Sequence, residues 1–246
     1  EPMSPRTVAI VQARMGSSRL PRKVLEKIGE QTMLERVLKR VASADRVDAV
    51  VVATTTNPMD DVIAAASLNG GWLLTRGSEN DVLDRYRQAA NEHEADVILR
   101  VCSDCPMTSP TVIDSVIAAV VDGDDVDYAA NNFPPASYPK GLDVEAFNRV
   151  SLERAWSEDE RPEWREHVTP YIRENASRFK QAHLRYERDL STLRWTVDTP
   201  EDLQLIRLLV DQCPPDASWE QIAAIQAAHP EWTAINRDIQ QRQIQR

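Results

Sequence analysis

The sequence is poor in cysteine, in long apolar runs and in positive charge. Three cysteines in 246 residues cannot form a disulfide framework, and so low and odd a number suits a reducing compartment, so we expect a cytoplasmic protein. No stretch approaches the roughly 20 apolar residues that a membrane-spanning helix needs, and the first residues lack the apolar core of a secretory signal. The formal net charge of −10, from 29 basic and 39 acidic side chains, disfavours binding to nucleic acid or to anionic membranes.

Two common phosphate-binding motifs are also absent. The chain has no G-x-x-x-x-G-K-[ST] loop and no G-x-G-x-x-G turn, so the sequence indicates neither a Walker-type NTPase nor a dinucleotide-binding protein. It has no internal repeat and no low-complexity segment. Its apolar content of 42% is enough for a substantial core, and its length suits one large domain.

Short apolar runs alternate with amphipathic stretches along the first half of the chain. This alternation predicts strands followed by helices of about ten residues, which is typical of a doubly wound, mostly parallel α/β sheet with a Rossmann-like fold. The expected strands are residues 8–11, 50–52, 72–74, 97–101 and 126–130. The expected helices are residues 33–41, 60–68, 82–93 and 112–121. Ligands lie beyond the carboxyl ends of such strands, so the loops that follow the first four strands should line one crevice.

The second half of the chain is less regular. Residues 133–141 are rich in proline and are predicted to form a loop. The expected helices are residues 152–156, 164–172, 200–210 and 219–228. The expected strands are residues 182–186 and 193–197.

A run of positive charge follows the first predicted strand. Residues 14–23, Arg-Met-Gly-Ser-Ser-Arg-Leu-Pro-Arg-Lys, hold four cations and no acidic side chain. In an acidic chain this is the place to hold an anion, because glycine and serine offer backbone and hydroxyl donors while the cations neutralise phosphate. A solvated basic turn explains the composition equally well.

Six segments of the chain carry motifs in a fixed order: residues 11–23, 76–86, 100–106, 138–145, 165–170 and 193–203. Together they resemble the cytidylyltransferases that activate acidic sugars, which include the acylneuraminate and 3-deoxy-manno-octulosonate (KDO) enzymes. The SpsF-like branch, named for spore-coat polysaccharide biosynthesis, is the most similar. One position departs from the family pattern, because Arg22 stands where the family usually has glycine before the lysine. Arg22 either alters the path of the loop or adds a phosphate contact.

The resemblance implies a fold of the nucleotide-diphospho-sugar transferase type and a CTP-dependent reaction. An oxygen of an acidic-sugar acceptor would attack the α-phosphorus of CTP, which gives pyrophosphate and a CMP-sugar for surface polysaccharide biosynthesis. The resemblance also implies Mg²⁺ as the cofactor and a homodimer as the assembly. The single domain 1–246 would comprise a nucleotide-binding half (7–132), an acceptor and dimerisation half with the second metal ligand (133–212), and a helical tail (213–246).

Two aspartates are the expected metal ligands. In the resembled family the aspartate of a D-x-P motif and the aspartate of a V-D-T-P-E-D motif bind the metal, and these are Asp104 and Asp198 here. Such a pair suits Mg²⁺, which takes one or two carboxylates together with phosphates and water. The residues alone favour Asp198 as the cap of the helix expected from Pro200, and only the family resemblance favours the metal role. We favour the metal role for Asp198 and assign the cap to Thr199.

The expected site residues form three groups. The catalytic group is Arg14, Lys23, Asp104 and Asp198. The nucleotide-binding group is Ala13, Arg14, Gly16, Ser17, Ser18, Arg19, Lys23, Arg76, Ser78, Arg100 and Asp104. The acceptor-binding group is Tyr138, Lys140, Asp143, Glu145 and His167. A carboxylate on the acceptor would suit Lys140.

Other interpretations of these residues stay open. Asp143 and Glu145, as alternating residues, share one face if their segment is extended, but a solvated loop is an equal alternative. Cys102 and Cys105 form a C-x-x-C pair without a second pair, which favours a structural role over zinc or redox chemistry. Two rival functions are a nucleotidyltransferase that uses another NTP with a sugar 1-phosphate or phosphonate, and a non-catalytic nucleotide-sugar-binding protein. A glycosyltransferase is a third rival function. Such an enzyme would be expected to carry a D-x-D metal-binding motif at the carboxyl end of a strand.

Overall fold

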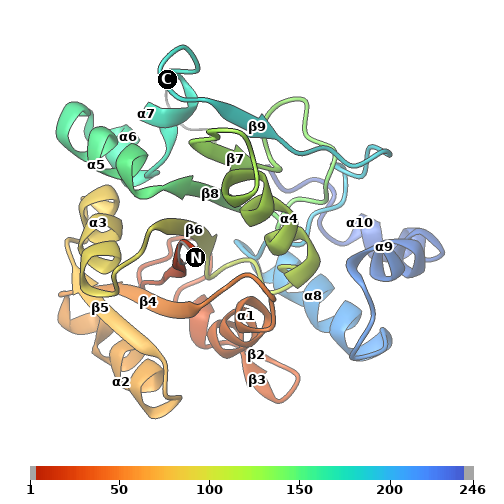
Figure 1. Ribbon diagram of the computed structural model, residues 1–246. Helices are drawn as coiled ribbons and strands as arrows, with labels where there is room; N and C mark the ends of the chain where they lie inside the picture. The colour runs from red at the N-terminus through yellow and green to blue at the C-terminus, as the bar shows by residue number, and fades with distance from the viewer. Residues whose placement is uncertain (1–3, 241–246) are drawn as a thin grey trace.

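In residues 4–240, which the computed structural model describes, seven strands form one sheet with the order β5-β4-β1-β6-β8-β7-β9 (Figure 1). The strands are β1 (Thr7–Gln12), β4 (Ala49–Thr55), β5 (Leu73–Gly77), β6 (Val97–Cys102), β7 (Tyr128–Ala130), β8 (Glu145–Asn148) and β9 (Gln181–His183). The first four of these are parallel, and β8 runs antiparallel to both of its neighbours. The predicted α/β class with a mostly parallel sheet is confirmed. A separate hairpin joins β2 (Lys27–Ile28) to β3 (Gln31–Thr32).

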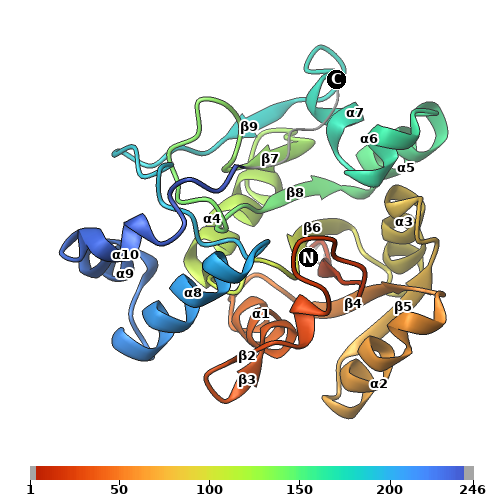
Figure 2. The same ribbon diagram turned by 180° about the vertical axis from the view of Figure 1, so that it is seen from behind.

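Helices cover both faces of the sheet. The helices are α1 (Met33–Ala42), α2 (Asp61–Asn69), α3 (Val82–Glu92), α4 (Pro110–Val121), α5 (Arg149–Glu158), α6 (Pro162–Glu166), α7 (Pro170–Arg173), α8 (Pro200–Gln212), α9 (Trp219–Ala227) and α10 (Pro230–Ala234). Two short 3-10 helices are η1 (Lys23–Leu25) and η2 (Pro58–Asp60). Figure 2 shows α9 and α10 together beside α8. No helix among residues 4–240 combines the length and the apolarity that crossing a membrane requires.

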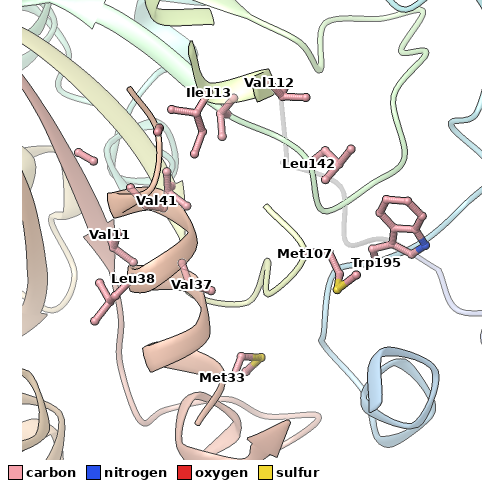
Figure 3. Packing of buried hydrophobic residues seen from close by; sticks show 14 of the residues in the cluster. Val11, Met33, Val37, Leu38, Val41, Met107, Val112, Ile113, Leu142 and Trp195 are labelled. Atoms are coloured by element: carbon pink, nitrogen blue, oxygen red, sulfur yellow. The ribbon is translucent and has the colours of Figure 1, made fainter. Parts of the chain in front are cut away.

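The two faces of the sheet carry two apolar cores, because alternate side chains of a strand point to opposite sides. Ala9 and Val11 of β1 join a core with α1, α2, α4, α8 and α9, while Val8 and Ile10 join a core with α3, α5 and α7. Figure 3 shows Leu38 and Val41 of α1 close to Val11. Burying each such side chain stabilises the fold by roughly 1.5–3 kcal/mol. These cores fix the strand ends, and with them the loops of the crevice.

Helix α1 illustrates how local sequence sets an element. Its large apolar side chains recur at helical spacing and are all buried, and its first turn is closed by a capping box. In that box the Thr32 hydroxyl accepts from the Glu35 N–H (3.1 Å), and the Glu35 carboxylate accepts from the Thr32 N–H (2.7 Å). The helix therefore begins at Met33, as the sequence predicts.

The single helix predicted for residues 164–172 is wrong. The chain instead forms α6 and α7, with Val168 between them in the left-handed region at φ 68°. Pro170 causes the break, because its nitrogen has no hydrogen to donate to a continuous helix and its ring would clash with the preceding turn. The interruption matters for function, since it brings His167 and Thr169 to the cleft.

The strand predicted for residues 193–197 is also wrong. This segment makes one isolated bridge, in which the Lys140 N–H donates to the Leu193 carbonyl (2.9 Å) and the Trp195 N–H donates to the Lys140 carbonyl (2.7 Å). Its alternating apolar residues are buried in the core rather than paired along a ladder. Gly141 permits the close approach, because it has φ 102° and a Cβ there would lie 2.6 Å from the Trp195 backbone.

The sequence pattern also missed some short elements of the fold. β8 was missed because it has four residues, too few for a clear alternation, and the β2–β3 hairpin is shorter still. The part of the predicted tail that the structure describes contains α9 and α10, and residues 241–246 lie outside the described residues.

Candidate active site

A cleft with a volume of about 960 Å³ lies where the loops after β1 and β6 meet. Most of the residues predicted for the site line it. These are Ala13, Arg14, Gly16, Ser17, Ser18, Arg19, Lys23, Arg100, Asp104, Tyr138, Lys140, Asp143, Glu145, His167 and Asp198. The loop that follows β4 was expected to line the crevice as well, but it does not reach it and instead supports the loop after β1.

A buried carboxylate holds the basic loop after β1 in place. The Met15 N–H donates to the Asp60 carboxylate (2.7 Å), and the Thr55 hydroxyl donates to the other oxygen of the same buried group. Arg22 adopts a left-handed conformation with φ 61°, which costs a non-glycine residue about 1–2 kcal/mol. That conformation explains why the resembled family has glycine here. Arg22 does not line the cleft, so it supplies no phosphate contact there.

At one end of the cleft, a lysine lies between the two predicted metal ligands. The Lys23 Nζ is 3.2 Å from Asp104 Oδ2 and 3.0 Å from Asp198 Oδ1, and it donates to the Val197 carbonyl oxygen at 2.8 Å. The other oxygen of Asp198 pairs with Arg194 (2.8 Å) and with Arg19 (3.3 Å). Chain segments more than 170 residues apart in sequence therefore meet at one point.

A third aspartate, Asp202, holds this arrangement in place. Asp202 is fully buried and accepts two hydrogen bonds from Arg194, at 2.8 Å and 3.1 Å. It also accepts from the Asp198 N–H (3.0 Å) and from Asn236 in the tail (2.8 Å). We call Arg19, Lys23, Asp104, Arg194, Asp198 and Asp202 the Asp198 cluster. Thr199 caps α8, as predicted, so the Asp198 carboxylate has no capping role.

The carboxylates and cations of the Asp198 cluster stabilise one another in their charged forms. Burial lowers the pKa of Lys23, but the carboxylates of Asp104 and Asp198 outweigh burial, and its pKa lies above the ordinary value. Burial raises the pKa of Asp198, but Lys23 and Arg194 outweigh it, and its pKa lies below the ordinary value. Both groups are therefore charged at neutral pH.

In another part of the cleft wall, a buried glutamate holds two arginines. Glu145 Oε2 accepts from Arg100 Nη1 at 2.8 Å, across the β6–β8 pair, and Glu145 Oε1 lies 3.7 Å from Arg173 Nη1. The hydroxyls of Tyr128 and Thr169 donate to Glu145 as well. We call these five residues the Glu145 cluster. Burial raises the pKa of Glu145, but the two arginines outweigh it, so its pKa lies below the ordinary value.

Two further titratable groups line the same part of the cleft. Burial raises the pKa of Asp143 to about 6, against the lowering effect of a hydrogen bond from the Gly141 N–H (3.2 Å). Burial and the nearby Arg100 lower the pKa of His167, so the imidazole is neutral at pH 7. Lys140 completes this wall of the cleft.

Arg76 and Ser78, predicted to read the nucleotide base, lie outside the lining of the cleft. Arg76 donates to the Thr55 carbonyl (2.8 Å) and pairs with Asp61 (2.8 Å), while the Ser78 hydroxyl accepts from the Asp81 N–H (3.0 Å). Both residues therefore brace the loops after β4 and β5. We withdraw them from the site, because their polar groups are used away from the cleft.

Arg85 lines the cleft near those loops and was missed by the sequence analysis. It is only 2% exposed, and it donates to the carbonyl oxygens of Ala53, Ser78 and Glu79. The signal was present, because Arg85 follows Val82 by three residues and so lies on the buried face of α3. Arg173 was missed too, and no local pattern marks it.

The C-x-x-C pair lies in the wall of the cleft. Burial raises the pKa of Cys102 to about 11, and the Cys105 thiol contacts Asp104 at 3.5 Å. Both sulfurs are thus protonated at neutral pH, and a thiol in that state is a poor nucleophile and a poor metal ligand.

The donor set around Lys23 suits a divalent cation. No group of three or more His, Cys, Asp or Glu side chains gathers for metal binding within residues 4–240. Two carboxylate oxygens and one carbonyl oxygen do surround the Lys23 ammonium within 3.2 Å. The ammonium marks a cation position among oxygens, and Mg²⁺ commonly binds one or two carboxylates plus phosphates. Asp104 and Asp198 therefore fit the metal, provided that Lys23 moves.

A family model described as cytidylyltransferase matches residues 8–231 of the chain. The chain belongs to the cytidylyltransferase family. Two relatives are similar to most of the chain. The spore coat polysaccharide biosynthesis protein SpsF of Bacillus subtilis is 32% identical over 235 residues, which is 90% of this chain and 94% of that protein. The uncharacterized protein MJ1063 of Methanocaldococcus jannaschii is 38% identical over 203 residues, 80% of each chain.

Solved structures agree with this assignment. A cytidylyltransferase from Leptospira borgpetersenii aligns with a TM-score of 0.88 and 29% identity, over 97% of this chain and 100% of that one. A CMP:2-keto-3-deoxy-manno-octonic acid synthetase in complex with CTP aligns with a TM-score of 0.64 and 21% identity, over 84% and 99%. The second likeness shows a shared fold. This cytidylyltransferase is SpsF-like, and it is a nucleotidyltransferase.

Proposed function

We propose that this cytidylyltransferase couples CTP to an acidic sugar and releases pyrophosphate. An acceptor oxygen attacks the α-phosphorus, the bond from that phosphorus to the bridging oxygen of the β-phosphate breaks, and the acceptor proton leaves to solvent. The observation that carries the proposal is the pairing of two charged clusters in one cleft. The Asp198 cluster and its basic loop suit a triphosphate, and the Glu145 cluster suits an anionic acceptor.

The loop after β1 provides for the triphosphate. Arg14, Arg19 and Lys23 line the cleft together with Gly16, Ser17 and Ser18, so cations and small polar residues face the same space. Such a set neutralises phosphate charge and donates to phosphate oxygens. Catalysis of this transfer depends on placement and charge stabilisation, which rigidly held donors supply. The related synthetase of known structure is described as complexed with CTP, which supports cytidine as the base.

The Glu145 cluster has the cations needed to bind a carboxylate on the acceptor. Arg100 and Arg173 both line the cleft, yet a single carboxylate, Glu145, faces the two guanidinium groups. The Nε of Arg100 is buried and has no hydrogen-bond partner among the described residues. A carboxylate from the acceptor would supply the missing acceptor atoms and balance the second positive charge. Lys140 and His167 stand on the same side and would orient the sugar.

Asp104 and Asp198 would hold Mg²⁺, which when bound supplies Lewis-acid stabilisation of charge on the phosphate oxygens. Asp198 is positioned for this by its own N–H bond to Asp202, and its carboxylate is not needed for the helix cap, which Thr199 provides. The homodimer and the role in surface polysaccharide biosynthesis remain predictions from the family resemblance.

Pyrophosphate release tests the proposed function. The protein would be incubated with CTP, UTP, GTP or ATP, Mg²⁺ and a panel of acidic sugars, with neutral sugars and sugar 1-phosphates as comparison. We expect pyrophosphate only with CTP and a sugar that carries a carboxylate. Release with another nucleotide and a sugar 1-phosphate would favour the rival transferase. Tight CTP binding with no release from any acceptor would favour a nucleotide-sugar-binding protein.

A further inference from the structure

The Lys23 side chain occupies the position between Asp104 and Asp198 that a bridging cation would take. Its ammonium contacts one oxygen of each carboxylate, at 3.2 Å and 3.0 Å, and the Val197 carbonyl oxygen at 2.8 Å. The side chains of Lys23 and Asp198 are each only 13% exposed. The contact is thus a partly buried ion pair and not a surface one that solvent would screen.

The charges around this point are balanced. Asp104, Asp198 and Asp202 supply three negative charges, and Arg19, Lys23 and Arg194 supply three positive ones. Both oxygens of Asp198 already have cationic partners. A free divalent cation therefore meets a neutral cluster in which both Asp198 oxygens and one Asp104 oxygen are paired, and it has to displace Lys23 before it can bridge the two carboxylates.

Of the two least exposed cations, Lys23 and Arg194, Lys23 is the more easily displaced. Arg194 is held by two hydrogen bonds to the buried Asp202, and its side chain is 6% exposed. Lys23 makes no two-bond pairing with a single buried carboxylate. Its ammonium instead makes one contact to each of three oxygens, and it sits on a flexible four-carbon stem. It also lies at the end of the basic loop that lines the cleft, so phosphate oxygens are within reach of a rotated side chain. An exchange of carboxylates for phosphates leaves no charge unpaired.

We propose that Lys23 is a resident counter-ion that keeps free divalent metal out of the Asp104–Asp198 site. It leaves these carboxylates only when a triphosphate offers it other anions. Metal and nucleotide therefore bind together, and metal alone binds weakly. This inference rests on the proposed function for the identity of the nucleotide, but the exclusion of free metal is a property of the protein by itself.

Mn²⁺ binding without nucleotide is the test, with electron paramagnetic resonance counting free and bound ion. Lys23→Met removes the ammonium and keeps most of the stem, and we expect it to bind Mn²⁺ at least tenfold more tightly than the unaltered protein. Lys27→Met is the matched control, because Lys27 is an exposed lysine of the adjacent hairpin and its ammonium donates to the Glu30 carbonyl oxygen of its own turn, at 3.4 Å. Its affinity for Mn²⁺ should equal that of the unaltered protein.

Two further variants locate the effect. Adding Asp104→Asn to Lys23→Met should remove the gain, which places the Mn²⁺ at this site. Lys23→Gln gives an uncharged side chain that still donates to the carboxylates, and it should also gain affinity if Lys23→Met folds poorly. Unchanged or weaker Mn²⁺ binding in folded Lys23 variants would overturn the inference.

CTP separates this inference from the proposed function. In the unaltered protein, saturating CTP should raise the Mn²⁺ affinity at least tenfold, and the rise should be smaller in Lys23→Met. If Lys23→Met gains affinity while CTP changes nothing in either protein, Lys23 excludes free metal but the proposed function fails. If CTP raises the affinity equally in both proteins, the proposed function stands and the exchange of Lys23 is contradicted.

Discussion

The Asp198 cluster and the Glu145 cluster are built from the same parts and differ in how firmly those parts are held. Each places carboxylates among arginine or lysine side chains in the wall of one cleft. The Glu145 side chain is 3% exposed and has partners in three parts of the fold. It accepts hydrogen bonds from Arg100 of β6, from Tyr128 of β7 and from Thr169, the N-cap of α7, and it forms an ion pair with Arg173 of α7. Asp104 is 28% exposed, and its single cationic partner is a flexible lysine. The first arrangement is a fixed support, and the second is open to exchange.

The difference follows from where each carboxylate sits in the sheet. Glu145 begins a strand and lies directly opposite Arg100 in the β6–β8 register, so the backbone ladder holds both partners. Asp198 follows an irregular segment that makes one isolated bridge, to Lys140 outside the sheet. A substrate anion can therefore compete for partners at the Asp198 cluster more readily than at the Glu145 cluster.

The largest expected effect is the loss of Glu145. We expect Glu145→Gln to lower the free energy of unfolding by about 3–5 kcal/mol, because it leaves buried arginines without their anion. Glu153→Gln is the control, since Glu153 also pairs with two arginines but is 36% exposed, and it should cost less than about 1 kcal/mol. Urea unfolding measures both. Equal costs would show that the Glu145 cluster is no firmer than a surface pair.

Replacing Asp143 should have the opposite effect and raise the free energy of unfolding. Its pKa is raised from 3.8 to about 6 in the folded protein, so the folded state holds the proton more tightly and loses stability as pH rises between these values. Asp143→Asn removes that loss. The variant should gain about 3 kcal/mol at most at pH 8 and less than about 1 kcal/mol at pH 4. Urea unfolding at the two pH values checks this, and a gain independent of pH would refute the burial argument.

Local patterns predicted much of the fold and of the site. Strand and helix periodicity gave the elements of the first half, and the order of the strand-end loops put the basic loop beside Asp104. The pairing of Lys23 with Asp198 could not be predicted, because 175 residues separate them and only tertiary packing joins them. Arg173 could not be predicted either, because its contact with Glu145 depends on tertiary packing and no local pattern marks it. The strand expected at 193–197 failed since burial in a core produces the same alternation as a ladder.

Asp104 should matter for binding more than for folding. Asp104→Asn should reduce the Mg²⁺-dependent gain in CTP affinity at least tenfold, about 1.4 kcal/mol, because one of two carboxylates is lost. Its unfolding free energy should change by less than about 1 kcal/mol, since the side chain is partly exposed. Calorimetric titration with CTP, with and without Mg²⁺, is the measurement. Asp122→Asn, at a carboxylate 55% exposed, is the control. An Mg²⁺ dependence that survives in Asp104→Asn would remove Asp104 from the metal site.

The smallest expected effect distinguishes the helix-capping role of Thr199 from the metal-binding role of Asp198. Thr199→Ala removes the hydroxyl that accepts from the Asp202 N–H, and it should cost about 1 kcal/mol of stability. Thermal unfolding measures this cost, and CTP affinity with Mg²⁺ should stay the same. A large loss of nucleotide affinity would mean that Asp198 depends on the cap for its position.

A crystal structure of the protein with CTP and Mn²⁺ tests the central claim most directly, because anomalous scattering locates the Mn²⁺. We predict an Mn²⁺ peak on Asp104 and Asp198, the Lys23 ammonium on a phosphate oxygen, and the Glu145 contacts unchanged. A triphosphate bound away from the basic loop, or an Mn²⁺ peak away from both aspartates, would contradict the account.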